Sequence, residues 1–223
     1  MSFSAEVKTE LAKQVSKSRH CQLAELSGIL QMEGKVVTSP FTLVLETDNP
    51  LLEEKYMVLM KKAFDIDATK AVGREETLRV LAAMKWIDNK NQIKLPIQEQ
   101  RTDGLIVQNT CCKRAFLRGA FMAAGSMSDP NKAYHFEIAC RNEAQAVQMQ
   151  EIINSFDSDA KIVERKGHQV YGPRLYELKH PPRQYTPKRY RPKDTYAGKG
   201  ILKIFFEVFF GESQMHRLYL HYC

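Results

Sequence analysis

The chain has 223 residues, a formal net charge of +7 and a hydrophobic content of 43%, which suffices for one sizeable core or two small ones. No apolar run approaches the ~20 residues that a transmembrane helix requires, and Glu6, Lys8 and Glu10 stand where a secretory signal peptide would be apolar. The five cysteines show no C-x-x-C spacing, as expected for reduced thiols. These features predict a cytoplasmic protein and argue against membrane-spanning and disulfide-stapled classes.

The positive charge is concentrated at one end. Residues 1–164 hold 21 Lys and Arg against 22 Asp and Glu, whereas residues 165–223 hold 12 against 4. The second segment also contains seven of the nine tyrosines and five of the nine prolines. A shift of this size marks a boundary, which we place near Val170.

The first half of the chain alternates helical and strand patterns. Ser4 is the expected N-cap of the first helix, and Asn49-Pro50 has the form of a helix start. The helix that follows should bury Leu52, Tyr56, Leu59 and Ala63. The periodicity predicts helices over residues 4–15, 21–32, 50–64 and 75–87, strands over residues 35–39, 41–47 and 67–73, and a strand candidate at 92–96.

The second half repeats this order. A helix is predicted over residues 110–124 and a half-buried strand over 133–140. Asn142 then caps a helix that runs to about Phe156, with Gln145 in position for a capping box. A strand over residues 160–164 and a turn over 165–168 follow.

One segment of the sequence occurs twice. Residues 21–34 (CQLAELSGILQMEG) and 112–125 (CKRAFLRGAFMAAG) match without gaps at a constant offset of 91, with identities at Cys21/Cys112, Ala24/Ala115, Leu26/Leu117, Gly28/Gly119 and Gly34/Gly125. Glycine inside a helix costs about 1 kcal/mol against alanine, so its repetition indicates a packing requirement. We predict that two helix backbones approach closely, with small residues at the contact: Ala24, Gly28, Gly34, Ala115, Gly119, Ala120 and Gly125.

The repeat is similar to the motif helix of LAGLIDADG homing endonucleases, in which two such helices pack at a pseudo-dyad. The chain resembles more closely the WhiA family of bacterial sporulation and cell-division regulators, over about residues 1–170. The resemblance rests on MSFSAEVKTELA at the start, on CQLAELSGILQMEG, on NEAQAVQMQEIINSFDSDAKIVERKG and most specifically on CCKRAFLRGAFMAAGSMSDPNKAYHFEI.

The resemblance implies an α+β fold, a LAGLIDADG-like pseudo-two-fold repeat with two motif helices packed at a dyad over a saddle-shaped sheet. It divides the chain into an N-terminal helix (1–19), a first half (20–105), an incomplete second half (106–170) and a basic tail rich in Tyr and Pro (171–223). The family's pattern continues with a partner strand, a further helix and a helix-turn-helix. None of these is recognisable in the tail, which we expect to be poorly ordered.

An active LAGLIDADG nuclease needs an acid from each motif helix, because divalent metals at the scissile phosphates take hard oxygen ligands from both sides. The resemblance places Glu33 at the first acid position and Ala124 at the second, and Asp129 lies beyond the expected helix end. We therefore predict no catalytic residue, no nuclease activity and no metal or other cofactor, with Glu33 as a vestigial acid.

Cys111-Cys112 is a second candidate for chemistry. Adjacent residues on a helix point about 100° apart and make a poor chelate alone, so buried hydrophobes are the favoured interpretation. Cys21 and Cys112 match in the repeat, which places both near the expected dyad. Cys111 shows no partner spacing, and His20 stands in no motif and is interpreted as a structural or surface residue.

Two basic groups are candidate DNA contacts, because Lys and Arg neutralise phosphates. One lies at a strand and turn: Lys161, Arg165, Lys166 and His168. The other is interleaved with tyrosines that can stack on bases: Arg183, Lys188, Arg189, Arg191 and Lys193. A solvated turn competes for the first group. For the tail, an out-of-frame continuation of the gene, a genuine basic arm and a small unrecognised domain remain open.

By resemblance, the predicted function is that of a DNA-binding transcriptional regulator in cell division, chromosome segregation or sporulation, here without a recognisable helix-turn-helix. The expected partners are DNA, in weak or non-specific contact, and other transcription or division proteins, with no membrane and no obligate small molecule. When bound to DNA it would be nucleoid-associated. The alternatives are an interaction scaffold with no nucleic-acid role and a metal-dependent homing endonuclease.

Overall fold

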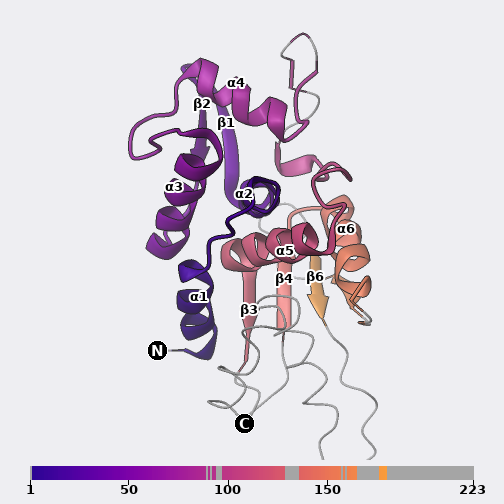
Figure 1. Ribbon diagram of the computed structural model, residues 1–223. Helices are drawn as coiled ribbons and strands as arrows, with labels where there is room; N and C mark the ends of the chain where they lie inside the picture. The colour runs from indigo at the N-terminus through magenta and orange to yellow at the C-terminus, as the bar shows by residue number, and fades with distance from the viewer. Residues whose placement is uncertain are drawn as a thin grey trace, which may run out of the picture.

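The computed structural model describes residues 2–88, 90, 92–93, 97–128, 136–156, 158, 160–164 and 176–179. Helices and short strands follow one another in these residues (Figure 1). The elements are α1 (Phe3–Lys13), α2 (Arg19–Glu33), β1 (Gly34–Thr38), β2 (Phe41–Leu45), α3 (Pro50–Phe64), α4 (Arg74–Ala83), η1 (Ile97–Glu99), α5 (Thr110–Ala124), β3 (Gly125–Met127), β4 (Phe136–Cys140), α6 (Glu143–Asn154), β5 (Lys161–Glu164) and β6 (Tyr176–Lys179).

The order helix, strand, strand, helix occurs twice. The motif helices α2 and α5 are each 15 residues long, and both ends of α5 lie 91 residues after the ends of α2. Each motif helix passes directly into a strand that pairs with the next strand as an antiparallel hairpin. The predicted α+β pseudo-repeat is therefore confirmed.

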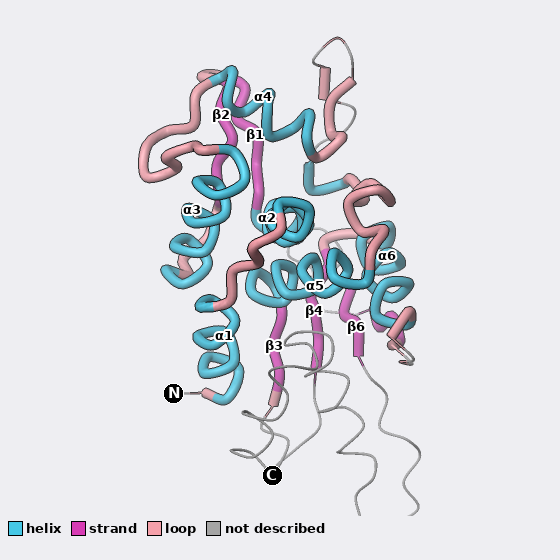
Figure 2. Tube along the Cα trace, in the orientation of Figure 1, coloured by secondary structure: helices cyan, strands magenta, loops and turns pink. Residues whose placement is uncertain are grey.

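The two motif helices cross in the middle of the molecule. In Figure 1, α2 is seen along its axis while α5 runs across the view. The two-stranded sheet β1–β2 lies on one side of this crossed pair, and β3, β4 and β6 lie on the other (Figure 2). The second sheet has the order β3-β4-β6-β5, with every neighbouring pair antiparallel.

Helix ends follow local capping chemistry. The Ser2 hydroxyl accepts a hydrogen bond from the Ala5 N–H at 3.3 Å, so Ser2 caps α1 and the prediction of Ser4 is wrong by two residues. Asn49 caps α3, whose predicted buried residues Leu52, Tyr56, Leu59 and Ala63 are all in the core. Asn142 caps α6 as predicted, but Gln145 accepts from the Arg141 N–H.

Two predicted elements differ from the structure. The segment 67–73 forms a turn instead of a strand, because the Asp67 carboxylate accepts bonds from both the N–H and the hydroxyl of Thr69. The helix predicted over 75–87 ends at Ala83, since Lys85 adopts a positive φ of 62°. The strand candidate at 92–96 is an isolated bridge between Ile87 and Ile93, and residues 94–96 lie outside the described residues.

The strand β6 corrects the prediction for the tail. It lies past the boundary near Val170, where no partner strand is expected from the sequence. It pairs with β4 on one side, Cys140 opposite Tyr176, and with β5 on the other, Lys161 opposite Lys179. The tail therefore supplies a strand to the second sheet.

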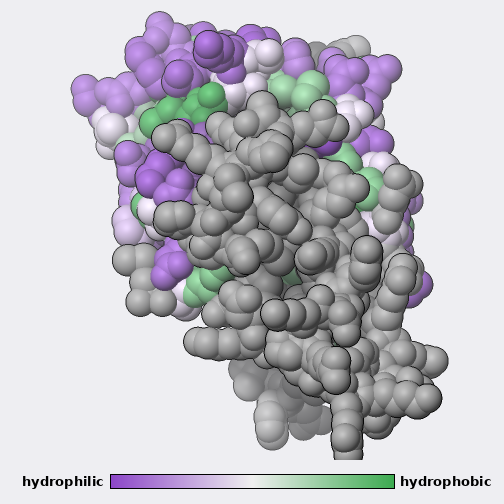
Figure 3. All heavy atoms as spheres, turned by 60° about the horizontal axis from the view of Figure 1, so that its bottom comes forward, coloured by the Kyte–Doolittle hydropathy of each residue, from purple (hydrophilic) through white to green (hydrophobic). Residues whose placement is uncertain are grey.

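The described surface that Figure 3 leaves uncovered is mainly hydrophilic, with apolar residues in small patches. Among the described helices, none combines the length and apolar character needed to span a bilayer.

Candidate functional site

The motif helices touch backbone to backbone at Gly28 and Gly119. A Cβ on Gly28 would lie 2.3 Å from the carbonyl oxygen of Phe116, and a Cβ on Gly119 would lie 2.1 Å from that of Glu25. Neither gap admits a methyl group without moving a helix backbone. Ala24, Ala115 and Ala120 on the same two helices are buried, and the backbone nitrogen of Ala120 would lie 3.0 Å from a Cβ on Gly28. The repeated glycines thus set the distance between the two halves.

Gly34 and Gly125 mark the helix ends that face the sheets. A Cβ on Gly34 would lie 2.4 Å from the Leu30 carbonyl oxygen, and one on Gly125 would lie 2.2 Å from the Phe121 ring. Both glycines have extended backbone and begin a strand. Each motif helix can therefore turn directly into its sheet, and the two helices end at Glu33 and Ala124. We call these two helix ends, with the residues around them, the base of the dyad.

Glu33 at that base is held by an arginine. The Nη2 of Arg141 donates to the Glu33 Oε2 at 3.1 Å, and both side chains are partly exposed. Burial raises the pKa of Glu33, and the Arg141 charge opposes the shift. At the matching position, Ala124 offers no ligand atom, and Asp129 lies outside the described residues. Among the described residues, the two acid positions therefore offer one carboxylate, paired with Arg141, where a two-sided metal site takes an acid from each helix.

Further charges at this base also occur in opposed pairs. Lys35 donates to Glu46 at 2.7 Å, and the Glu46 N–H donates to the Glu33 carbonyl at 2.8 Å. Lys8 stands over the Phe121 ring at 5.8 Å. Burial lowers the pKa of Lys8, and the Glu33 carboxylate opposes that shift. In the part of the base that the structure describes, acidic and basic side chains therefore alternate, and no cluster of acids forms a metal site.

A buried ion triad joins the two halves next to the glycine contact. Glu25 accepts from Arg118 Nε at 2.9 Å and Nη2 at 2.8 Å, and Lys55 Nζ lies 3.0 Å from Glu25 Oε1. Lys55 also donates to backbone carbonyls around the end of α1, including Leu11 at 3.1 Å and Gln14. Burial lowers the pKa of Lys55, and the Glu25 charge opposes it. The sequence does not predict this triad, because Glu, Lys and Arg usually signal surface positions.

A second buried polar network ties α2 to α6. Gln148 donates to the Thr102 carbonyl at 2.7 Å and accepts from the Thr102 N–H at 2.9 Å. Thr102 bonds in turn with Ser27 at 2.7 Å and with Gln31 at 3.1 Å. The segment before α5 is thereby fixed against both motif-bearing halves. These glutamines carry no motif, so their role is visible only in the fold.

Cysteines gather where the two motif helices begin. His20 Nδ1 lies 3.2 Å from Cys112 Sγ and 3.3 Å from Cys21 Sγ. Cys111, which the sequence leaves without a partner, joins them, and all four ligand atoms lie within 4.8 Å of one another. Burial raises the pKa of Cys21 to about 12 and also raises the pKa of Cys112. His20 is exposed, which agrees with its interpretation as a surface residue, but it lies with Cys111 in one cluster that the sequence spacing does not predict.

The predicted DNA contacts fall mainly outside the described part of the chain. Lys161 is exposed at the start of β5. Its neighbours Arg165, Lys166 and His168 and the tail residues Arg183, Lys188, Arg189, Arg191 and Lys193 lie outside the described residues. Their role as DNA contacts stays a prediction.

Two family models match the two halves of this fold. Residues 19–94 match the WhiA N-terminal LAGLIDADG-like domain, and residues 113–174 match the WhiA LAGLIDADG-like domain. The chain belongs to the WhiA family. Proteins named "Probable cell division protein WhiA" are similar to it: that of Lachnoclostridium phytofermentans is 43% identical over 187 residues, and that of Lachnospira eligens is 40% identical over 184.

These alignments cover 76% and 74% of this chain but only 60% and 57% of the two WhiA relatives. The chain therefore spans less than two thirds of their length. Among solved structures, full-length DUF199/WhiA from Thermatoga maritima aligns with a TM-score of 0.54 at 18% identity, over 99% of this chain and 72% of that one. The N-terminal LAGLIDADG domain of DUF199/WhiA aligns with a TM-score of 0.52 at 19% identity, over 79% and 83%. These two structural matches show a common fold and nothing further.

Proposed function

We propose that this chain supplies the non-catalytic LAGLIDADG-like part of a DNA-binding transcriptional regulator that acts in bacterial cell division. The proposal rests on the residues that stand at the two acid positions, 33 and 124. Glu33 is paired with Arg141, and Ala124 replaces its counterpart. The helix contact of a LAGLIDADG domain is thus combined with one carboxylate at the two acid positions, which supports a role without metal-dependent hydrolysis.

The proposal for DNA rests on charge and on the family. The relatives are named as cell division proteins. The segment 165–223 concentrates the excess positive charge, which favours contact with phosphates by counterion release. We propose a weak and sequence-independent contact through Lys161, Arg165, Lys166 and His168 and through the five tail residues Arg183, Lys188, Arg189, Arg191 and Lys193.

The test combines binding and cleavage on the full chain. Fluorescence anisotropy with labelled duplex DNA should show weak binding that falls linearly on a log–log plot against salt. Replacing the five tail residues together by Gln should reduce the slope by up to about 4.5, since each phosphate contact contributes about 0.9. A control with exposed Lys17, Lys62 and Lys70 changed to Gln should keep the slope. Incubation with Mg²⁺ or Mn²⁺ should leave the DNA intact.

An interaction scaffold without nucleic-acid binding is the second candidate. It is favoured by the balance of charge over residues 1–164, 21 basic against 22 acidic. Absence of any anisotropy change at the lowest salt would select it. Metal-dependent cleavage that Glu33→Gln abolishes would overturn both proposals and make the chain a nuclease.

A further inference from the structure

The cysteine–histidine cluster is built by the pseudo-repeat itself. His20 and Cys21 open α2, and Cys111 and Cys112 open α5. The offset of 91 that relates the two helices carries His20 onto Cys111 and Cys21 onto Cys112. Two adjacent residues on one helix make a poor chelate. The crossing at Gly28 and Gly119 places a second such pair opposite the first, so four ligand atoms converge.

We propose that His20, Cys21, Cys111 and Cys112 bind one Zn²⁺ ion, with three thiolate sulfurs and the Nδ1 of His20 as ligands. Three sulfurs and one imidazole nitrogen are the donor set of structural zinc sites. Zinc–sulfur and zinc–nitrogen bonds of about 2.3 and 2.0 Å set ligand separations of about 3.5–3.8 Å in a tetrahedron. The imidazole nitrogen already lies 3.2 and 3.3 Å from two sulfurs, and no separation in the cluster exceeds 4.8 Å.

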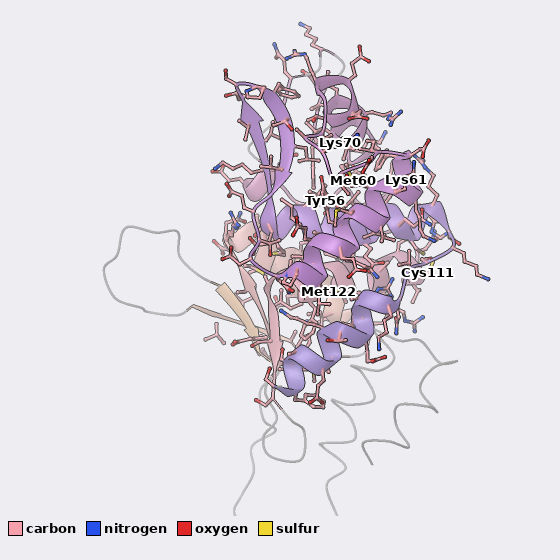
Figure 4. All side chains as sticks on the ribbon, turned by 90° about the vertical axis from the view of Figure 1, so that its left-hand side faces the viewer. Tyr56, Met60, Lys61, Lys70, Cys111 and Met122 are labelled. Atoms are coloured by element: carbon pink, nitrogen blue, oxygen red, sulfur yellow. The ribbon has the colours of Figure 1, made fainter. Side chains whose placement is uncertain are left out.

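Access and surroundings also suit an ion. Cys21 and Cys112 are buried, whereas His20 and Cys111 are exposed, so an ion can enter from solvent and then be enclosed on its inner side. Figure 4 marks Cys111, which lies on the exposed side of the cluster. The cluster sits at the N-terminal ends of α2 and α5, where the helix dipoles favour the negative charge of thiolates. Zn²⁺ replaces the three thiol protons on binding, so no oxidant or reductant is needed.

The ion would have a structural task. The first and second halves are separate matches to two family models, and the ligands come in equal number from each. A zinc ion at the start of both motif helices would clamp them at one end, while the glycine contact and the Glu25 triad hold them further along. This task is independent of DNA binding and of the fate of Glu33.

The test is metal analysis and cobalt substitution of the full chain, purified under reducing conditions. We expect one zinc per chain by mass spectrometry of the metal content. The metal-free chain should take up one Co²⁺, with the thiolate charge-transfer bands and visible bands of tetrahedral cobalt, and Zn²⁺ should displace it. Cys111→Ser and His20→Asn should each weaken Co²⁺ binding about tenfold or more and alter the bands. Both positions are exposed, so circular dichroism should show these variants to be folded.

The matched control is Cys140→Ser, which changes a described cysteine outside the cluster and should keep full metal binding. A folded wild-type chain with no cobalt bands would overturn the proposal. Bands that persist at full strength in both Cys111→Ser and His20→Asn would do the same. A disulfide within the cluster in the freshly purified reduced chain, seen as a mass lower by two hydrogens, would also overturn it and assign the cysteines to redox chemistry.

Discussion

The two motif helices have the same length and the same glycine contact but different chemistry. Along α2, positions 25 and 33 are glutamates, and each is paired with a cationic side chain from outside α2. The matching positions on α5 are Phe116 and Ala124, which carry no charge. Both helices therefore contribute to the packing contact, whereas the two acidic side chains occur only on α2, where they form ion pairs. The pseudo-dyad is therefore a symmetry of the helix packing, and the charges on the two helices do not follow it.

The largest expected effect comes from the buried acid of α2. Glu25→Gln leaves Lys55 and Arg118 buried without a counter-charge, which should lower the free energy of unfolding by about 3–5 kcal/mol. Chemical denaturation monitored by circular dichroism measures it. The control is Glu54→Gln on the exposed side of α3, which should change stability by less than about 0.5 kcal/mol. Equal effects of the two substitutions would show that the triad does not hold the halves together.

The contact between α2 and α5 should be weakened by a larger residue at either of its two glycines. Gly28→Ala and Gly119→Ala each push a methyl group into the partner backbone and should each cost about 3 kcal/mol, the upper end for overpacking. Gly104→Ala is the matched control, because a Cβ there meets nothing within 4 Å. Thermal denaturation of the three variants compares them. A melting temperature for Gly119→Ala equal to that of Gly104→Ala would contradict the close approach of the helices.

The glutamine network should have an intermediate effect. Gln148→Ala leaves the buried N–H and C=O of Thr102 without their partner, which should cost about 1–3 kcal/mol. Amide hydrogen exchange should show faster exchange at Thr102, with little change at the α2–α5 contact. Gln108→Ala, at an exposed position in the same segment, serves as the control. Unchanged exchange at Thr102 would mean that water replaces the glutamine without loss.

The smallest effect is expected at Glu33, where the charge is partly solvated. Because its pKa is raised in the folded chain, the folded state holds the proton more tightly than the unfolded state does. Its contribution to stability is therefore present below the ordinary glutamate pKa of about 4.3 and is lost as pH rises to the folded pKa. Glu33→Gln should remove this fall and change stability at neutral pH by less than about 1 kcal/mol. A larger loss of stability in Glu33→Gln would contradict a partly solvated charge at this position. A wild-type stability that rises with pH above about 4.3, and no longer does so in Glu33→Gln, would contradict a raised pKa of Glu33.

The packing of the two motif helices could be predicted from the sequence, because each helical segment contains an interior glycine and the two segments match at one offset. Gly28 and Gly119 are costly in a helix, and their common offset identifies both motif helices and their junctions with the strands. The same offset relates His20 to Cys111 and could have revealed the cysteine cluster. The cluster is missed because each pair, taken alone, is a poor chelate.

Other features depend on contacts that no local pattern encodes. Lys55 is five residues from the start of an amphipathic helix and resembles a surface lysine, yet the end of α1 and Glu25 bury it. The strand β6 has an alternating pattern, Tyr176 and Leu178 against Glu177 and Lys179, but neighbouring prolines conceal it. Its place in the sheet, between β4 and β5, comes from pairing with strands that lie earlier in the chain.

We propose that the base of the dyad does not bind a divalent metal, because Glu33 is paired with Arg141 and position 124 is an alanine. Electron paramagnetic resonance of Mn²⁺ tests it directly, since this ion takes the hard oxygen ligands of such sites. We expect Glu33→Gln to leave any Mn²⁺ binding by the wild-type chain unchanged. Ala124→Glu combined with Arg141→Gln should create a bound signal that Glu33→Gln then removes. Mn²⁺ binding by the wild-type chain that Glu33→Gln abolishes would contradict it.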